Sequence, residues 1–165
     1  MLAIYAPTNP TKNKYNLRNV LENAGPHIPK PQMMLGDLNT VKSAADRYPT
    51  HLNTQDVSAS FLELTAWLGL ADGWRHMHLR KSCATYRDRE RGISSRIDCI
   101  YVTNELLLVS RDWKNKITPF LSMDHSPMQV DLVNLSMPIV GPGQWTMTQR
   151  NLCLHDLWPK LIEQG

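Results

Sequence analysis

Cysteine is scarce in this chain of 165 residues, which has only Cys83, Cys99 and Cys153. Their number is odd, they are widely spaced, and none belongs to a Cys-x-x-Cys pair. The sequence therefore gives no basis for a zinc site built on cysteines or for a disulfide framework. A reducing, intracellular compartment is the simplest interpretation.

Long apolar runs are also missing. No stretch reaches the roughly 18 apolar residues that a membrane helix needs, so we expect no membrane partner. The first ten residues, MLAIYAPTNP, lack the basic segment of a signal peptide. The chain instead opens directly on strand-like sequence, which suggests a piece of a longer protein.

Charge of one sign is nearly balanced by the other. The 18 Lys and Arg residues exceed the 15 Asp and Glu residues only slightly, which gives a net charge of +3. An excess this small is compatible with a polyanionic substrate but does not argue for one, because nucleic-acid binders usually concentrate more positive charge. At 42% hydrophobic residues, the composition is that of a globular domain.

The first 39 residues carry the pattern of a β-α-β unit. An apolar run at residues 2–6 stops at Pro7, as expected of a buried strand. The next apolar residues have helical spacing: Leu17, Val20, Leu21 and Ala24. A second apolar run at residues 33–35 follows, and the order strand, helix, strand predicts an α/β fold.

The rest of the chain continues the mixed pattern. Helical spacing recurs at residues 57–68, alternating polarity at 96–102 and a last strand pattern at 128–132. We expect a long loop at 40–55 and a solvated segment at 74–81.

Two prolines and two glycines at 137–143 indicate a linker. We therefore predict one domain over residues 1–135, followed by a linker and a short amphipathic helix over 136–165.

Three polar clusters are assigned to the C-terminal ends of predicted strands: Gly-Asp-Leu-Asn at 36–39, Ser-Arg-Ile-Asp at 95–98 and Asp-His-Ser-Pro at 124–127. Together they supply three carboxylates, an amide and an imidazole, a set that suits metal-assisted hydrolysis of a phosphate ester. Each cluster alone has a plainer interpretation as a turn, a solvated edge or a cap. Their joint occurrence in this order favours the hydrolase.

With Tyr-Ala-Pro at 5–7, these clusters resemble the later motifs of the endonuclease/exonuclease/phosphatase superfamily, which includes abasic-site endonucleases, deoxyribonucleases and inositol polyphosphate phosphatases. Ser-Arg-Ile-Asp, and Gly-Pro-Gly-Gln-Trp at 141–145, are similar in particular to the endonuclease domain of LINE-type (non-LTR) retrotransposons and the segment after it. The resemblance implies a partial four-layer α/β/β/α sandwich with mixed sheets and flanking helices. It also implies a divalent-metal-dependent phosphodiester hydrolase acting on DNA.

The resemblance also implies a role for each residue of the catalytic group. Asp37 would be the base or would orient the attacking water, and Asn39 would help to hold that water or the phosphate. Asp98 would hydrogen-bond His125 and fix its tautomer. His125 would then contact the scissile phosphate.

The remaining roles concern the cofactor and the substrate. Asp124, with Asp37, would bind Mg²⁺ or Mn²⁺. Tyr5 would contact a phosphate oxygen through its hydroxyl. Ser95 and Arg96 would contact the nucleic-acid backbone, although Arg96 could equally be a solvated strand residue.

One departure from the family pattern stands out. Family members begin with a strand bearing an Asn and a later strand bearing the Glu that is the principal metal ligand, and this chain has neither. We therefore expect an N-terminally truncated fragment, which need not be active. It would belong to a longer polyprotein that includes reverse transcriptase. The protein would be nuclear if it acts on chromosomal DNA. The alternatives are a phosphoinositide or sphingolipid phosphoesterase of the same fold, and a non-catalytic remnant.

Overall fold

The computed structural model describes residues 1–23, 29–50, 59–116 and 124–134. Residues Met1–Val133 form one compact unit, which contains the whole of the predicted domain except its last two residues. The expected linker and helix of 136–165, and the motif at 141–145, lie outside the described residues.

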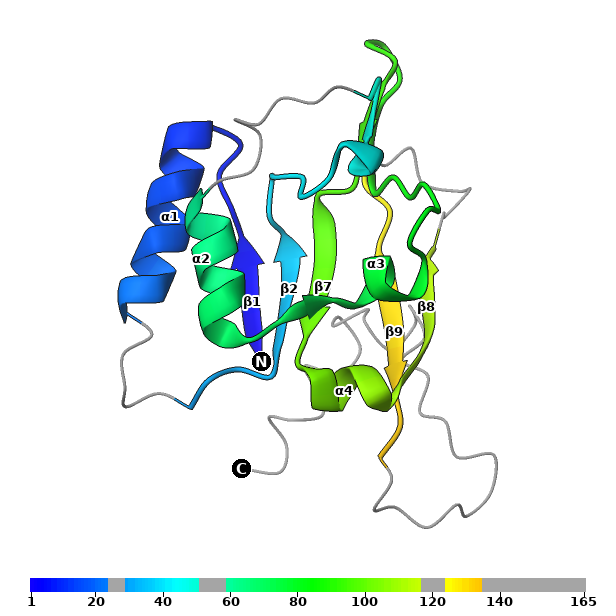
Figure 1. Ribbon diagram of the computed structural model, residues 1–165. Coiled ribbons are helices and arrows are strands. Elements are labelled where there is room, and N and C mark those ends of the chain that lie inside the picture. Colours follow the sequence, from blue (N-terminus) through cyan, green and yellow to red (C-terminus); the bar gives the residue numbers. More distant parts are fainter. Residues whose placement is uncertain (24–28, 51–58, 117–123, 135–165) are drawn as a thin grey trace, which may run out of the picture. The chain divides into compact units, whose positions relative to one another are not determined.

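A mixed four-stranded sheet forms the centre of the unit (Figure 1). Its strand order is β1 (Leu2–Tyr5), β2 (Met33–Asp37), β7 (Asp98–Val102) and β4 (Ala71–Asp72). Strands β1 and β2 are parallel, whereas β7 is antiparallel to both β2 and β4. The parallel pair, with a helix between its strands in the chain, confirms the predicted β-α-β unit.

Helices α1 (Pro10–Asn23) and α2 (Ala59–Leu68) pack on one face of this sheet. Leu17 from α1 and Phe61 from α2 are buried with sheet residues, and the Phe61 and Tyr101 rings meet edge to face at 5.4 Å. The apolar stripes read from the sequence therefore do face the core. Burial of such a stripe, more than helix propensity, stabilises short helices.

The other face of the sheet packs on a second apolar cluster. Outside the sheet, this cluster contains side chains from α3 (Gly73–Met77), α4 (Asn104–Leu108), β8 (Ser110–Asn115) and β9 (Met128–Leu132). Strands β8 and β9 form an antiparallel pair. Trp74 is only 3% exposed in this cluster, so the expectation of a solvated segment at 74–81 is wrong at this residue. Residue 74 lies in α3, where burial of its large ring outweighs the polarity of its neighbours.

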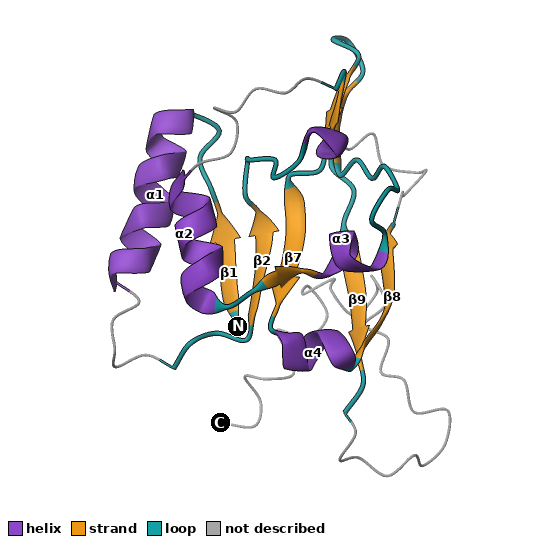
Figure 2. Cartoon of the chain, viewed as in Figure 1, coloured by secondary structure: helices purple, strands orange, loops and turns teal. Residues whose placement is uncertain are grey.

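A small three-stranded sheet extends from the end of the central sheet (Figure 2). It has the order β3 (Arg47–Tyr48), β6 (Ile93–Ser95) and β5 (Tyr86–Asp88). The predicted loop at 40–55 therefore contains β3 and a short 3-10 helix, Ala44–Asp46, while its residues after 50 lie outside the described ranges.

These elements make a mixed α/β fold, with helices over one face of the central sheet and a second sheet over the other. This arrangement agrees with the expected partial α/β/β/α sandwich. Within the described ranges, no helix has the length and apolar character needed to cross a membrane.

Gly36 is required by the close approach of β1 and β2. Its φ is +133°, and a Cβ at this position would lie 1.9 Å from the carbonyl oxygen of Ile4. We expect Gly36→Ala to lower the free energy of unfolding by about 2–3 kcal/mol, because the strands must separate or the backbone must strain. Urea unfolding followed by circular dichroism measures this loss.

The matched control is Gly69→Ala, at a glycine with φ +67° and open space around its Cβ position. We expect a loss of only about 1 kcal/mol there, from the backbone conformation alone. Equal losses in the two variants would show that the contact with Ile4 is unimportant.

Candidate active site

Strand register places three of the motif residues in one row. Tyr5 pairs with Asp37 across β1 and β2, and Asp37 pairs with Asp98 across β2 and β7. Directly opposed residues on neighbouring strands project from the same face of a sheet. The adjacent row contains Ile4 and Cys99, which belong to the cluster under α1 and α2, so the row of Asp37 faces away from these helices.

The position of Asp98 in its strand differs from the expected one. The motif at 95–98 was predicted at the C-terminal end of a strand, but Asp98 is the first residue of β7. Because β7 runs antiparallel to β2, its start lies beside the end of β2, where Asp37 is the last residue. The two carboxylates still reach one edge of the sheet.

Asp98 and His125 form a direct pair. The Nδ1 atom of His125 lies 2.8 Å from Oδ2 of Asp98, with the two side chains 37% and 23% exposed. The ring of Tyr86 packs against the imidazole at a centroid distance of 5.1 Å. A carboxylate at this distance fixes Nδ1 as the protonated nitrogen and leaves Nε2 as the atom available to a ligand.

Asn39 holds the Asp37 carboxylate at the end of β2. Its backbone N–H donates to Oδ1 of Asp37 at 2.9 Å, and its side-chain Nδ2 donates to the carbonyl oxygen of Ala6 at 2.7 Å. The φ of Asn39 is +45°, a conformation that asparagine adopts more readily than most residues. The turn after β2 is thereby tied to the turn after β1.

Burial raises the pKa of the Asp37 carboxyl, and the nearby Asp98 charge raises it further. The hydrogen bond from the Asn39 backbone and the charge of His125 act in the opposite direction. Asp37 is therefore a carboxylate whose ionised form is held at some cost, which is a frequent property of functional groups.

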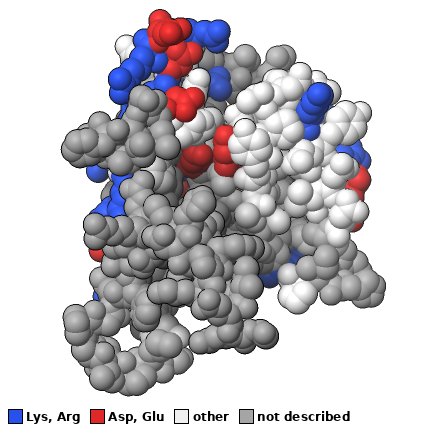
Figure 3. All heavy atoms as spheres, turned by 180° about the vertical axis from the view of Figure 1, so that it is seen from behind, with Lys and Arg blue, Asp and Glu red and all other residues white. Residues whose placement is uncertain are grey.

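Asp37, Asp98 and His125 each offer one ligand atom, and these atoms all lie within 4.8 Å of one another. The donor set fits a hard divalent cation, which prefers carboxylate oxygen and would offset the repulsion between the two acids. Figure 3 shows acidic atoms gathered near the middle of one face of the molecule. The structure thus brings together three of the residues that the sequence singled out.

Tyr5 and Asp124 have different positions relative to this group. Tyr5 is 80% exposed at the end of β1 in the same row, so its hydroxyl is accessible to a ligand. Asp124 is exposed and, among the described residues, does not belong to the group that could share an ion. Its assignment as a metal ligand stays a prediction.

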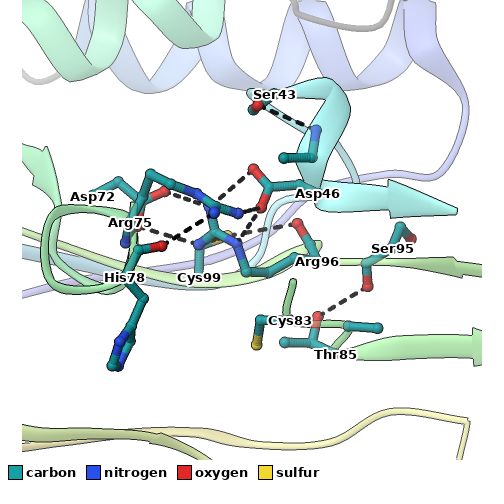
Figure 4. A network of polar contacts seen from close by, with 12 residues as sticks. Ser43, Asp46, Asp72, Arg75, His78, Cys83, Thr85, Ser95, Arg96 and Cys99 are labelled. Carbon is teal, nitrogen blue, oxygen red and sulfur yellow. Dashed lines mark hydrogen bonds and ion pairs between the residues drawn. The ribbon is translucent and has the colours of Figure 1, made fainter. Parts of the chain in front are cut away.

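Arg96 differs from both interpretations offered by the sequence, because it is neither a surface contact for nucleic acid nor a solvated strand residue. It is 1% exposed, and its guanidinium bonds Asp46, with Nε to Oδ1 at 2.8 Å, and Asp72, with Nη1 to Oδ1 at 3.2 Å (Figure 4). Strand β7 begins only at Asp98, so the alternation read from the sequence does not extend to this residue. Ser95, 7% exposed, is likewise buried.

Three residues around these groups, Asp46, Asp72 and Thr85, had no role predicted from the sequence. Asp46 lies 50 residues before Arg96, and Asp72 lies 24 residues before it. Thr85 accepts hydrogen bonds from the backbone of Ile97 and Asp98. None of the three belongs to a motif, and a single sequence carries no signal that pairs residues so far apart.

Comparison with known proteins supports the fold. No protein-family model matches the sequence, and no curated protein matches it. Solved structures do match. An AP endonuclease from Archaeoglobus fulgidus matches at 21% identity over 79% of this chain and 60% of that chain, with a TM-score of 0.60. The 3' phosphatase NExo from Neisseria, bound to product DNA hairpin, matches at 21% identity over 79% of this chain and 60% of that chain, with a TM-score of 0.61. The endonuclease domain of TRAS1, a telomere-specific non-LTR retrotransposon, matches at 19% identity over 81% of this chain and 56% of that chain, with a TM-score of 0.50.

At these identities the likeness establishes the fold. The chain shares its fold with the AP endonuclease and with NExo, which agrees with the mixed α/β fold that the sequence predicted. It spans about 60% of the length of the AP endonuclease and of NExo.

We expect Asp37→Asn to stabilise the protein at neutral pH, since it removes a partly buried charge that Asp98 repels. A folded-state pKa above the unfolded value means that stability falls as pH rises through that window. The melting temperature should therefore rise by about 1–2 °C at pH 7, and the difference should vanish at about pH 3, below the ordinary pKa of an aspartate. Scanning calorimetry at the two pH values measures it. A lower melting temperature of Asp37→Asn at pH 7 would contradict the conclusion that the ionised Asp37 carboxylate destabilises the fold.

Proposed function

We propose that this chain is the C-terminal portion of a divalent-metal-dependent phosphodiester hydrolase that cleaves DNA. The observation that carries the proposal is the meeting of Asp37, Asp98 and His125 at one edge of the central sheet. A pair of acids with an acid-oriented imidazole suits the attack of water on a phosphodiester, which needs positioning and charge neutralisation more than covalent chemistry. The fold, shared with nucleases and a DNA 3' phosphatase, agrees with this class.

Each residue of the group would have its own task. The Asp37 carboxylate would orient the attacking water and accept its proton, a role that its raised pKa favours. Asp98 would keep the proton on Nδ1 of His125 and hold the ring in its orientation. The Nε2 atom of His125 would then donate to a phosphoryl oxygen, and the exposed Tyr5 hydroxyl could bind another.

Mg²⁺ or Mn²⁺ would be held by Asp37 with help from Asp98, because these carboxylates supply the oxygen ligands such ions prefer. The ion, when bound, would neutralise charge on the phosphate. Two carboxylates make a weak site, so we propose that a segment preceding this chain supplies the principal carboxylate. This proposal is supported by the match to the AP endonuclease, which covers only 60% of that protein.

The proposed origin is a non-LTR retrotransposon, in which the chain would belong to a polyprotein with reverse transcriptase and act on nuclear DNA. The motif Ser-Arg-Ile-Asp at 95–98 and the fold likeness to the TRAS1 domain support it.

Plasmid nicking tests the function. The chain is assayed by itself and, where its gene continues upstream, with the preceding segment, in Mg²⁺ and in a chelator. We expect Mg²⁺-dependent nicking by the longer form, unaffected by His76→Ala at an exposed histidine of α3. No nicking by the longer form would sink the proposal and favour a non-catalytic remnant. Phosphate release from an inositol polyphosphate without nicking would favour the phosphoesterase.

A further inference from the structure

Thr85 lies between the two segments that carry Asp98 and His125, and its surroundings are unusual for a residue outside every motif. It is fully buried, with an exposed fraction of 0%. Its hydroxyl oxygen accepts two hydrogen bonds from successive backbone amides, that of Ile97 at 3.0 Å and that of Asp98 at 2.9 Å. One side-chain atom therefore satisfies the first amide of β7 and the amide just before it.

The backbone of Thr85 binds the segment of His125. Its carbonyl oxygen accepts from the N–H of Ser126 at 2.6 Å, and its own N–H donates to the carbonyl oxygen of Ser95 at 2.9 Å. The following residues extend this contact, because Tyr86 forms a β-bridge with His125 and the Arg87 N–H donates to the Asp124 carbonyl oxygen at 2.8 Å. Thr85 thus contacts the amide of Asp98 and the residue next to His125.

We propose that Thr85 is a positioning residue that sets the distance between Asp98 and His125. The inference rests on the proposed function for its catalytic consequence, whereas its structural consequence can be measured without it. Without the hydroxyl, two buried amides would lose their acceptor, and buried amides rarely stay unpaired. The start of β7 would shift to find new partners, and the Asp98 carboxylate would move with it.

A small shift is enough to matter. The Asp98–His125 pair is a 2.8 Å hydrogen bond, and such bonds weaken steeply with added distance or poor alignment. Catalytic groups work only when held within about 0.5 Å of their productive geometry. A threonine whose single oxygen fixes the Asp98 amide, and whose carbonyl oxygen fixes the residue beside His125, provides that constraint.

The decisive variants are Thr85→Val, which keeps the shape but removes the acceptor, and Thr85→Ser, which keeps the acceptor. Thr65→Val is the matched control: Thr65 is also buried, at 5% exposure, but its hydroxyl donates to the Phe61 carbonyl oxygen within α2. In each folded variant, nitrogen-15 NMR of the histidine rings reports whether Nδ1 of His125 keeps its hydrogen-bonded proton. We expect that signal to be lost in Thr85→Val and kept in Thr85→Ser and Thr65→Val.

In the form of the protein that nicks DNA, Thr85→Val should lower kcat by about 10–100-fold with a smaller change in KM, as supporting residues commonly do. Thr85→Ser should restore most of the rate. Loss of the His125 ring signal only in Thr85→Val supports the inference even if no form of the protein nicks DNA. The NMR measurement tests the position of His125 and the nicking assay tests the proposed function, so the failure of one is distinguished from the failure of the other. An unchanged ring signal in Thr85→Val overturns the inference.

If Thr85→Val does not fold, the exchange rates of backbone amide hydrogens in the unmodified chain test the inference instead. The amides of Ile97, Asp98 and Ser126 should exchange slowly and together, because one buried residue accepts all three. Exchange of the Asp98 amide at the rate of an exposed amide would overturn the inference.

Discussion

Arg96→Met should destabilise the protein by about 3–5 kcal/mol, a large part of the roughly 5–15 kcal/mol that holds a domain folded. Arg96 is the buried cation between Asp46 and Asp72, whose side chains are 1% and 5% exposed. Arg75 also pairs with Asp46, so loss of Arg96 leaves Asp72 as the carboxylate with the least compensation. Removal of one member of a buried ion pair costs far more than the pair itself contributes.

Urea unfolding followed by tryptophan fluorescence measures this loss. Arg91→Met is the control, because Arg91 is 78% exposed and its pairing with Asp88, at 3.6 Å, should contribute less than about 1 kcal/mol. Adding Asp72→Asn to Arg96→Met should recover part of the stability, since asparagine keeps the oxygen that caps α3 and removes the unpaired charge. Equal stability of Arg96→Met and Arg91→Met would contradict the importance of the cluster.

Asp98→Asn should lower kcat for DNA nicking by about 10²–10⁴-fold while leaving the fold intact. Asparagine has nearly the same shape, but its neutral amide does not fix the proton on Nδ1 of His125 as the carboxylate does. Initial nicking rates at saturating Mg²⁺, in the form of the protein that is active, measure the loss. His125→Ala should lose as much, and the double variant little more, because the two residues act as a unit.

The control for this series is Asp112→Asn, at an exposed aspartate of β8 that lies 3.5 Å from Lys114. It removes the same charge by the same substitution outside the candidate site, and we expect nicking within about twofold of the unmodified rate. A loss of less than about threefold in Asp98→Asn would exclude the Asp98–His125 pair from the reaction.

Local patterns were sufficient for much of the fold. The apolar run at residues 2–6 and the helical stripe through Leu17 correspond to β1 and α1. Their burial is decided by residues a few positions apart, so a periodic sequence is enough to predict it. Trp74 is the counterexample, because its burial depends on an apolar cluster built from β7, β8 and β9.

The candidate site divides in the same way. Asp37, Asp98 and His125 were predicted because each belongs to a short motif, and a short motif can be recognised in a single sequence. The burial of Arg96 could not be predicted in this way. Whether an arginine faces solvent or a buried acid depends on residues distant in the chain, here Asp72 and Asp46, which lie 24 and 50 positions before it.

The sequence by itself determined the first strand–helix–strand unit, the fold class and the three residues that form the group at the sheet edge. Only the tertiary structure decided that β7 runs antiparallel to β2, that Arg96 is internal and that Thr85 joins the two halves of the site. The physical reason is range. Hydrophobic periodicity acts between near neighbours in the chain, whereas strand register and buried hydrogen bonds are set by residues that meet only after folding.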